Sequence, residues 1–349
     1  MAKQTALLCA LNNEISQKAD LLKDKEIISV YFGGGTPFLF ESHFLEEILQ
    51  KIRACNVKFS KNAEITIEAN PEDISTEKIK HLKDIGFNRI SIGVQSLDDD
   101  LLKLLGRTHS KNIILDAINT VYDSGIENIS IDLMYDVPKQ TINSWQNTLD
   151  LLKDLPISHI SLYNLTIEPN TAFYRRKNEL TKQRPSGINS KEMLIRAIES
   201  FKQLGLMRYE ISAFAKNNQY SKHNVGYWLN RNCIGYGPSA FSYYNGERVQ
   251  NYCSFPKYVN AILKKESPVD FVDQISFPEK VKEAFIISLR LLQGVDLNVF
   301  EDRYGELPSD AKESIEKLYF EGYLQKNNGN ICLTDKGLLF YDSLASEII

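Results

Sequence analysis

The chain has 349 residues, of which 43% are hydrophobic and 25% are charged, and its formal net charge is −4. This composition is typical of a folded protein with one large or two ordinary domains, and it excludes a disordered chain. A net negative chain offers no general basic field, so we do not expect nucleic acid as a partner.

Hydropathy and cysteine usage indicate the cellular compartment. The apolar run over residues 6–11 is too short to span a membrane, and Asn12-Asn13-Glu14 follows it without a cleavage-like site. The cysteines are scattered and odd in number, which indicates reduced thiols; they are Cys9, Cys55, Cys233, Cys253 and Cys332. We therefore expect a cytoplasmic protein without an obligate membrane segment.

In chain order, apolar periodicity predicts strands that alternate with helices. The expected strands cover residues 26–32, 63–69, 89–95, 128–134, 158–163 and 208–214. The expected helices cover residues 3–22, begin at Ser42, Ser75 and Asp98, and cover residues 110–122, 141–153 and 190–204. Six strands in this order predict a parallel α/β fold.

The strand over residues 26–32 ends abruptly in Gly33-Gly34-Gly35-Thr36-Pro37. Three successive glycines remove every side chain, so main-chain groups can approach a ligand closely and adopt positive φ. The motif predicts a backbone cradle for a small molecule at the carboxyl end of a strand. An ordinary strand-to-helix turn is the alternative.

Polar residues share one face of successive strands, opposite isoleucines and valines. Glu68, Gln95 and Asp132 lie on this face near the carboxyl ends of their strands, and Arg107 follows the third strand. An open sheet covered on both faces rarely carries such a pattern, whereas a barrel with a polar lumen does. Each residue alone could be a hydrogen-bonded core group; together they suit a zwitterionic nucleoside.

Five ordered motifs resemble the radical S-adenosylmethionine (SAM) proteins related to oxygen-independent coproporphyrinogen III oxidase. The similarity runs over nearly the whole chain. The motifs are Tyr31-Phe-Gly-Gly-Gly-Thr-Pro37, Ile67-Glu-Ala-Asn-Pro71, residues 86–96, Leu105-Gly-Arg107 and residues 131–141.

This resemblance implies an incomplete parallel (β/α)6 TIM-like barrel with SAM lying across the lumen. The implied cofactor contacts, matched motif by motif, are Gly34, Gly35, Thr36, Glu68, Gln95, Arg107 and Asp132. Two weaker matches are Thr166 in Leu165-Thr-Ile-Glu-Pro169 and Phe241 in Gly235-Tyr-Gly-Pro-Ser-Ala-Phe241.

The sequence departs from the family in one respect. Family members hold a 4Fe-4S cluster on Cys-x3-Cys-x2-Cys after the first barrel strand, and this sequence contains no such triplet. The resemblance places that loop before the helix at residues 3–22, so we expect the first strand and the cluster ligands upstream of Met1. A lineage that has lost the cluster is the alternative.

Within the family, His223-Asn-Val-Gly-Tyr-Trp228 is similar to the haem chaperone branch. Members of that branch bind haem and are thought to pass it to acceptor proteins. His223 is a candidate haem ligand because imidazole binds iron well; a histidine bonded to backbone is the alternative. A coproporphyrinogen III dehydrogenase that forms protoporphyrinogen IX, and a cluster-free tetrapyrrole-binding protein, both remain open. An unrelated barrel enzyme is disfavoured, because no lysine occupies an inner strand position and no His/Asp/Glu metal triad appears among the strand ends.

The pattern of the remaining residues predicts two further regions. Residues 217–270 form a connector packed on the barrel mouth of residues 1–216, and residues 271–349 form a small helical, winged-helix-like domain. The wing is expected from Gly322-Tyr-Leu followed by residues 329–334, before a helix from Asp335. Since this stretch is not basic, DNA binding is a weak interpretation.

Overall fold

A computed structural model describes residues 2–349. The chain forms two compact units. The barrel unit consists of Ser29–Ser42 and Glu64–Tyr220, and the helical unit consists of the other described residues. The domain boundaries expected near residues 216 and 270 stay a prediction.

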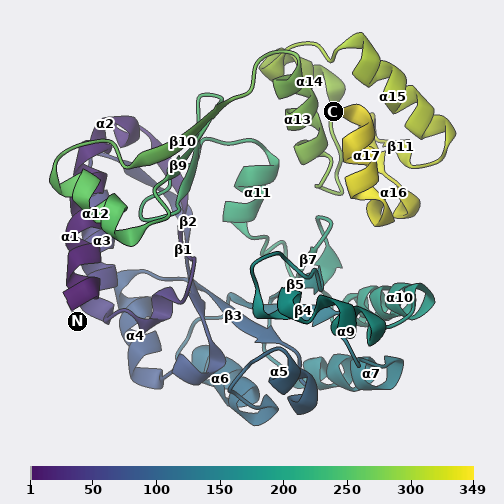
Figure 1. Ribbon diagram of the computed structural model, residues 1–349, viewed down its shortest axis with the longest axis horizontal. Coiled ribbons are helices and arrows are strands. Elements are labelled where there is room, and N and C mark those ends of the chain that lie inside the picture. The colour runs from purple at the N-terminus through teal and green to yellow at the C-terminus, as the bar shows by residue number, and fades with distance from the viewer. Residues whose placement is uncertain (1) are drawn as a thin grey trace. The chain divides into compact units, whose positions relative to one another are not determined.

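The barrel unit is built on a curled, mostly parallel sheet of seven strands in the order β1-β2-β3-β4-β5-β7-β6 (Figure 1). The strands are β1 (Glu26–Phe32), β2 (Lys58–Ala69), β3 (Arg89–Gln95), β4 (Ile129–Tyr135), β5 (His159–Asn164), β6 (Met207–Arg208) and β7 (Ala213–Ala215). Strands β2 to β5 pair in parallel, with Ile67 opposite Ile90 and Ile92 opposite Ile131. The half-barrel expected from the sequence is confirmed.

Helices connect the parallel strands. They are α4 (Thr76–Ile85), α5 (Asp99–Leu104), α6 (Lys111–Asp123), α7 (Ile142–Leu151), α8 (Ala172–Arg175), α9 (Lys177–Lys182) and α10 (Gly187–Gln203), with 3-10 turns η1 (Pro37–Leu39), η2 (Pro71–Asp73) and η3 (Leu152–Asp154). The predicted starts are confirmed at Ser75, which accepts the N–H of Lys78, and at Asp98, which accepts those of Asp100 and Leu101.

The two faces of the sheet differ in burial only in part, because Thr66, Ser91 and Ser130, which share the phase of Glu68 and Asp132, are themselves buried. Ile90, Ile92 and Ile131 are fully buried on the face that packs against helices. Glu68 and Asp132, which have the opposite phase, are only partly buried. Burial of the isoleucines fixes the register, since a slip by one residue would turn them all to the other face.

The prediction of a sixth parallel strand over residues 208–214 is wrong. The segment forms two short strands, of which β7 runs antiparallel to both β5 and β6. The chain reverses because Tyr209 N–H donates to the Ala213 carbonyl at 3.1 Å and Glu210 accepts the N–H of Ser212 at 2.9 Å. The polar alternation of Glu210 and Ser212 therefore belongs to a turn.

The helical unit contains helices and two small antiparallel sheets. Its helices are α1 (Ala2–Gln17), α2 (Ala19–Leu22), α3 (Ser42–Arg53), α11 (Lys222–Trp228), α12 (Phe255–Leu263), α13 (Glu279–Ser288), α14 (Leu297–Tyr304), α15 (Ser309–Phe320), α16 (Asp335–Leu339) and α17 (Tyr341–Ile348). Its sheets are formed by β8 (Phe241–Tyr244), β9 (Glu247–Asn251) and β10 (Val269–Gln274), and by β11 (Leu324–Asn327) and β12 (Asn330–Leu333). The β11–β12 pair and the helix from Asp335 confirm the predicted wing and its last helix.

The three-stranded sheet was not predicted within the connector. Its β8–β9 hairpin turns at Asn245 and Gly246, which have φ values of 51° and 89°. An Asn-Gly pair with positive φ at both residues is a strong hairpin signal, and it stands in the sequence. No helix within residues 2–349 has the length and apolar character needed to cross a membrane.

A buried carboxylate holds α1 in the helical unit. Glu14 has no exposed surface. Its oxygens accept hydrogen bonds from four groups: Lys18 Nζ at 2.6 Å, Gly237 N–H at 2.8 Å, Asn251 Nδ2 at 2.7 Å and Tyr258 Oη at 2.7 Å. Burial, and then the Glu14 charge, raises the pKa of Tyr258, so its phenol stays protonated and donates.

We expect Glu14→Ala to lower the free energy of unfolding by about 3 kcal/mol, because it leaves several buried donors without an acceptor. Glu47→Ala is the matched control, since Glu47 is exposed and accepts one bond from Asn12 of α1. Its loss should cost about 0.5 kcal/mol or less. Urea unfolding measures both variants; equal losses would contradict the role assigned to Glu14.

Candidate functional site

The glycine bend, Gly33–Gly35, follows β1 directly. Gly34 and Gly35 have φ values of 80° and 75°, a conformation that strains any residue with a Cβ atom. A Cβ atom at Gly33 would lie 2.5 Å from the Tyr31 ring, whereas one at Gly34 or Gly35 would meet no atom within 4 Å. The backbone of the last two glycines therefore faces open space, as a ligand cradle requires.

Glu68 of β2 fixes this bend. Its Oε2 accepts the Gly34 N–H at 3.1 Å, and its Oε1 accepts the Tyr31 hydroxyl at 2.7 Å. Burial and then the Glu68 charge raise the pKa of Tyr31, which keeps the phenol as a donor. One carboxylate thus joins the end of β2 to both sides of the β1 terminus.

Asn70 links two further predicted residues. Its Nδ2 donates to Thr36 Oγ1 at 3.3 Å, and its Oδ1 accepts from Arg107 Nη1 at 3.4 Å. The structure therefore brings Thr36 and Arg107 to the same edge of the sheet as Glu68. The sequence prediction did not include Asn70, although it lies within the quoted Ile67–Pro71 motif.

Glu72 contacts two residues of the loop that carries Arg107. His109 Nδ1 lies 2.6 Å from Glu72 Oε2, and Thr108 Oγ1 donates to Glu72 Oε1 at 3.3 Å. The His109 side chain has no exposed surface. Sequence reasoning also missed this pair, and the neighbouring Leu105-Gly-Arg107 motif is the signal that could have drawn attention to it.

Gln95 is the last residue of β3, whereas Asp132 is the fourth of the seven residues of β4. The ladder between β3 and β4 shifts between Ile92 and Gln95, and Gln95 has a φ of 65°. Burial raises the pKa of Asp132 to about 6, and the nearby Glu68 charge adds to this, while Ser161, Arg89 and Arg107 act in the opposite direction. Asp132 and Glu68 are therefore close enough to interact electrostatically.

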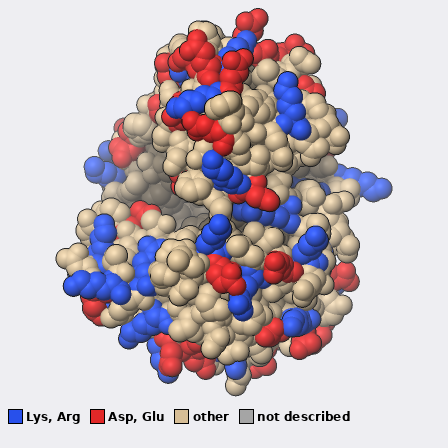
Figure 2. Space-filling model, turned by 90° about the vertical axis from the view of Figure 1, so that its right-hand side faces the viewer, with Lys and Arg blue, Asp and Glu red and all other residues tan. Residues whose placement is uncertain are grey.

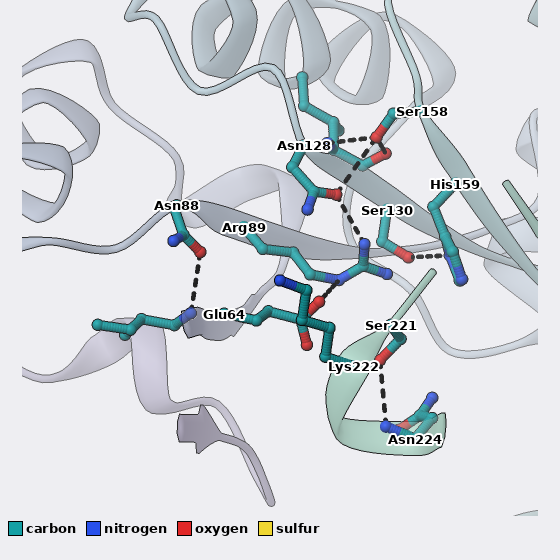
Figure 3. Close-up of polar contacts among 12 residues, drawn as sticks. Glu64, Asn88, Arg89, Asn128, Ser130, Ser158, His159, Ser221, Lys222 and Asn224 are labelled. Carbon is teal, nitrogen blue, oxygen red and sulfur yellow. Dashed lines mark hydrogen bonds and ion pairs between the residues drawn. The ribbon is translucent and has the colours of Figure 1, made fainter. Parts of the chain in front are cut away.

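Hydrogen-bonded polar groups occupy the sheet near the amino ends of the strands (Figure 3). Arg89 Nη1 donates to Asn128 Oδ1 at 2.7 Å, and its Nε lies 4.0 Å from Glu64 Oε2. His159 lies between Ser130 Oγ at 2.8 Å and Tyr209 Oη at 2.9 Å, and burial keeps the pKa of its imidazole well below the usual value. These buried groups already have partners, so the available ligand groups lie at the carboxyl ends.

The other predicted residues lie elsewhere in their units. Thr166 follows β5 in the barrel unit and is exposed. Phe241 begins β8 in the helical unit, with 57% of its surface exposed. In α11, His223 Nε2 lies 2.9 Å from Tyr227 Oη, and burial lowers the pKa of His223 to about 4. Their ligand roles stay predictions.

The described residues fit SAM better than an iron–sulfur cluster. The open glycine backbone, two carboxylates and Arg107 supply the donor and acceptor types that a zwitterionic nucleoside needs. By contrast, residues 2–349 contain no grouping of three His, Cys, Asp or Glu side chains that could hold a metal, and all five cysteines are free. We therefore derive no step through a cluster.

Comparison with known proteins identifies the class and then the family. The model of the radical SAM superfamily matches residues 11–152, and that of the HemN C-terminal domain matches residues 275–340. The structure of coproporphyrinogen III oxidase (HemN) from Escherichia coli superposes with a TM-score of 0.84 at 23% identity, covering 99% of this chain and 83% of that chain. Together these define a radical SAM half-barrel protein.

Two relatives are similar over nearly their whole length. Heme chaperone HemW of Bacillus subtilis (strain 168) is 32% identical over 95% of this chain and 88% of that protein. HemW of Buchnera aphidicola subsp. Schizaphis graminum is 33% identical over 96% of this chain and 87% of that protein. The chain belongs to the HemW family, and membership implies SAM and a 4Fe-4S cluster as family cofactors.

The raised pKa of Asp132 makes stability depend on pH. Because the folded state holds this proton more tightly than a carboxyl with the ordinary pKa of 3.8, the contribution of Asp132 to stability is fully present below about pH 4. It is lost as the pH rises through about 6. We expect Asp132→Asn to raise the free energy of unfolding by about 2 kcal/mol near pH 7.5, with no gain below about pH 4.

Urea unfolding across this pH range measures the effect. Asp116→Asn, at an exposed position of α6, is the control and should follow the wild type at every pH. Parallel curves for wild type and Asp132→Asn would show that Asp132 does not titrate as assigned.

Proposed function

We propose that this protein binds SAM in the half-barrel, binds haem, and acts as a haem chaperone. The observation that carries the proposal is the glycine bend, which Glu68 holds near the carboxyl end of β2, with Asp132 of β4 within electrostatic reach of Glu68. The similarity of about one residue in three to proteins named heme chaperone HemW supports the haem function. Tetrapyrrole is therefore the expected cargo, and a haem-accepting protein is the expected partner.

The residues of the barrel unit divide the recognition of SAM among them. The Gly34 and Gly35 backbone and the Thr36 hydroxyl would contact its polar groups. Glu68 and Asp132 would accept bonds from hydroxyl or ammonium groups, and Arg107 would bind the carboxylate. Gln95 and Thr166 are the remaining proposed contacts within the barrel unit. When bound, SAM supplies a sulfonium group, and cleavage of one of its carbon–sulfur bonds forms the radical for which the superfamily is named. We propose no redox step.

His223 is the proposed ligand of the haem iron. Burial lowers its pKa to about 4, so the imidazole is neutral at physiological pH and has a lone pair for iron. Its Nε2 is engaged by the Tyr227 hydroxyl, and Cys233 Sγ lies 3.9 Å from the same oxygen. Iron binding at Nε2 would require the phenol to move away.

Oxidation of coproporphyrinogen is not proposed. The likeness to HemN from Escherichia coli has 23% identity and shows a shared fold alone. The relatives from Bacillus subtilis and Buchnera aphidicola, which have higher identity, carry the chaperone name.

We expect Glu68→Gln to weaken SAM binding by about tenfold or more, because a charge-assisted contact is lost and the glycine bend is loosened. Isothermal titration calorimetry measures the affinity. Glu77→Gln on the exposed face of α4 is the matched control and should bind as the wild type does. Unchanged affinity in Glu68→Gln, with intact circular dichroism, would remove Glu68 from the site.

We expect His223→Ala to shift the Soret band of bound haem and to weaken haem binding by roughly tenfold, because an imidazole ligand is lost. His43→Ala, at an exposed position of α3, should leave both unchanged. Tyr227→Phe keeps the imidazole and should retain the histidine-bound spectrum. Identical spectra and affinities for wild type and His223→Ala would rule out His223 as the ligand.

A further inference from the structure

The segment between β5 and α10 is unusually basic for this chain. Residues 172–184 contain a single acidic residue, Glu179, and five basic ones: Arg175, Arg176, Lys177, Lys182 and Arg184. The chain as a whole has a net charge of −4. Positive charge is therefore concentrated in α8 and α9, which follow the carboxyl end of β5.

Hydrogen bonds fix the end of this segment to the rest of the barrel unit. Arg184 donates to Asp136, to Asn164 Oδ1 at 3.0 Å and to the Leu165 carbonyl at 3.0 Å. Lys139 N–H donates to the Gln183 carbonyl at 2.7 Å. The loop after β4 and the end of α9 therefore lie side by side, which adds Lys139 to the same basic region.

The start of the segment is also anchored. Phe173 packs against a buried apolar cluster formed by Leu101, Val137 and Leu165. The next residue, Tyr174, keeps 43% of its surface exposed, and Lys177 Nζ lies 5.3 Å from the centroid of its ring. An accessible aromatic ring thus lies beside a cation at a fixed place.

Of these cations, Arg176 and Arg184 form ion pairs; Lys139 forms none in the described chain, but after the hydrogen bond from Arg176 its charge also lowers the pKa of Glu179. Arg176 makes two bonds to Glu179, at 3.0 and 2.7 Å, and Arg184 pairs with Asp136. Within residues 2–349, the side chains of Lys139, Arg175, Lys177 and Lys182 form no ion pair, and all four are exposed. Figure 2 shows Lys and Arg side chains, with Asp and Glu among them, on the side of the molecule on which Figure 1 draws α9 and α10.

We propose that Lys139, Arg175, Lys177 and Lys182, with the ring of Tyr174, form a binding surface for the carboxylates of a planar anionic ligand. The cations suit the propionates of a tetrapyrrole, and the aromatic ring suits the face of its macrocycle. The inference therefore rests on the proposed function and names the residues of the barrel unit that would select this ligand. Unpaired cations held on one surface repel one another, and an anion with two or more carboxylates relieves this repulsion. An aromatic ring beside them offers a flat apolar contact.

The test uses protoporphyrin IX without iron, so that ligation by His223 plays no part, and its dimethyl ester, which lacks the two carboxylates. We expect Arg175→Glu/Lys177→Glu to weaken binding of the diacid by about tenfold or more at low salt, and to leave binding of the ester unchanged. High salt should reduce the difference, because the contacts are exposed. Fluorescence of the porphyrin reports binding.

Lys202→Glu is the matched control for Lys177→Glu. Lys202 is exposed near the end of α10, just before β6. Strand β6 lies level with the start of β5, because Met207 pairs with Ala215 and Ala215 pairs with His159. The control therefore reverses one charge near the amino-terminal ends of the strands, away from α8 and α9. It should bind the diacid as the wild type does. Lys177→Glu alone should weaken binding by roughly threefold.

The outcomes separate the two proposals. Equal affinities of wild type and double variant for the diacid, or equal weakening by Lys202→Glu, would overturn the carboxylate surface while leaving the haem function intact. Failure of the wild type to bind haem or protoporphyrin would overturn the proposed function, and this surface with it. Circular dichroism melting of each variant verifies that the protein is folded.

Discussion

The carboxylate of Glu68 is the constraint on which the candidate site depends. Gly34 and Gly35 have no side chains with which to hold their left-handed conformation, and a free glycine segment would pay the largest conformational entropy on ligand binding. Hydrogen bonds from Gly34 N–H and the Tyr31 hydroxyl to Glu68 hold the bend in place before any ligand arrives. The parallel pairing of β2 with β3, and of β3 with β4, then places Gln95 at the end of β3 and Asp132 in the middle of β4 on the neighbouring strands.

The electrostatics of the candidate site complement a cation. Asp132 is partly neutralised by Arg89 and Arg107, yet burial and the charge of Glu68 still raise its pKa to about 6. A sulfonium or ammonium group near the two carboxylates would stabilise their ionised forms and lower that pKa. Buried pairs at the amino ends, such as Arg89 with Asn128, are already satisfied and do not compete for the ligand.

Features set by local sequence could be predicted, and those set by distant partners could not. Strands β1 and β3 match their predicted bounds because each is a short apolar or alternating run that ends at a clear break. Residues 208–214 alternate in the same way, but hydrogen bonds of Glu210 and Tyr209 turn them into a hairpin. Asn70 and His109 were missed because their roles arise from partners more than thirty residues away, Thr36 and Glu72.

A crystal structure of the protein grown with S-adenosylmethionine tests the central claim most directly. The account predicts the ligand against the backbone of Gly34 and Gly35, with the carboxylates of Glu68 and Asp132 facing its polar groups and Arg107 at its carboxylate. A ligand bound away from the glycine bend, with Glu68 and Asp132 making no contact to it, would contradict the account.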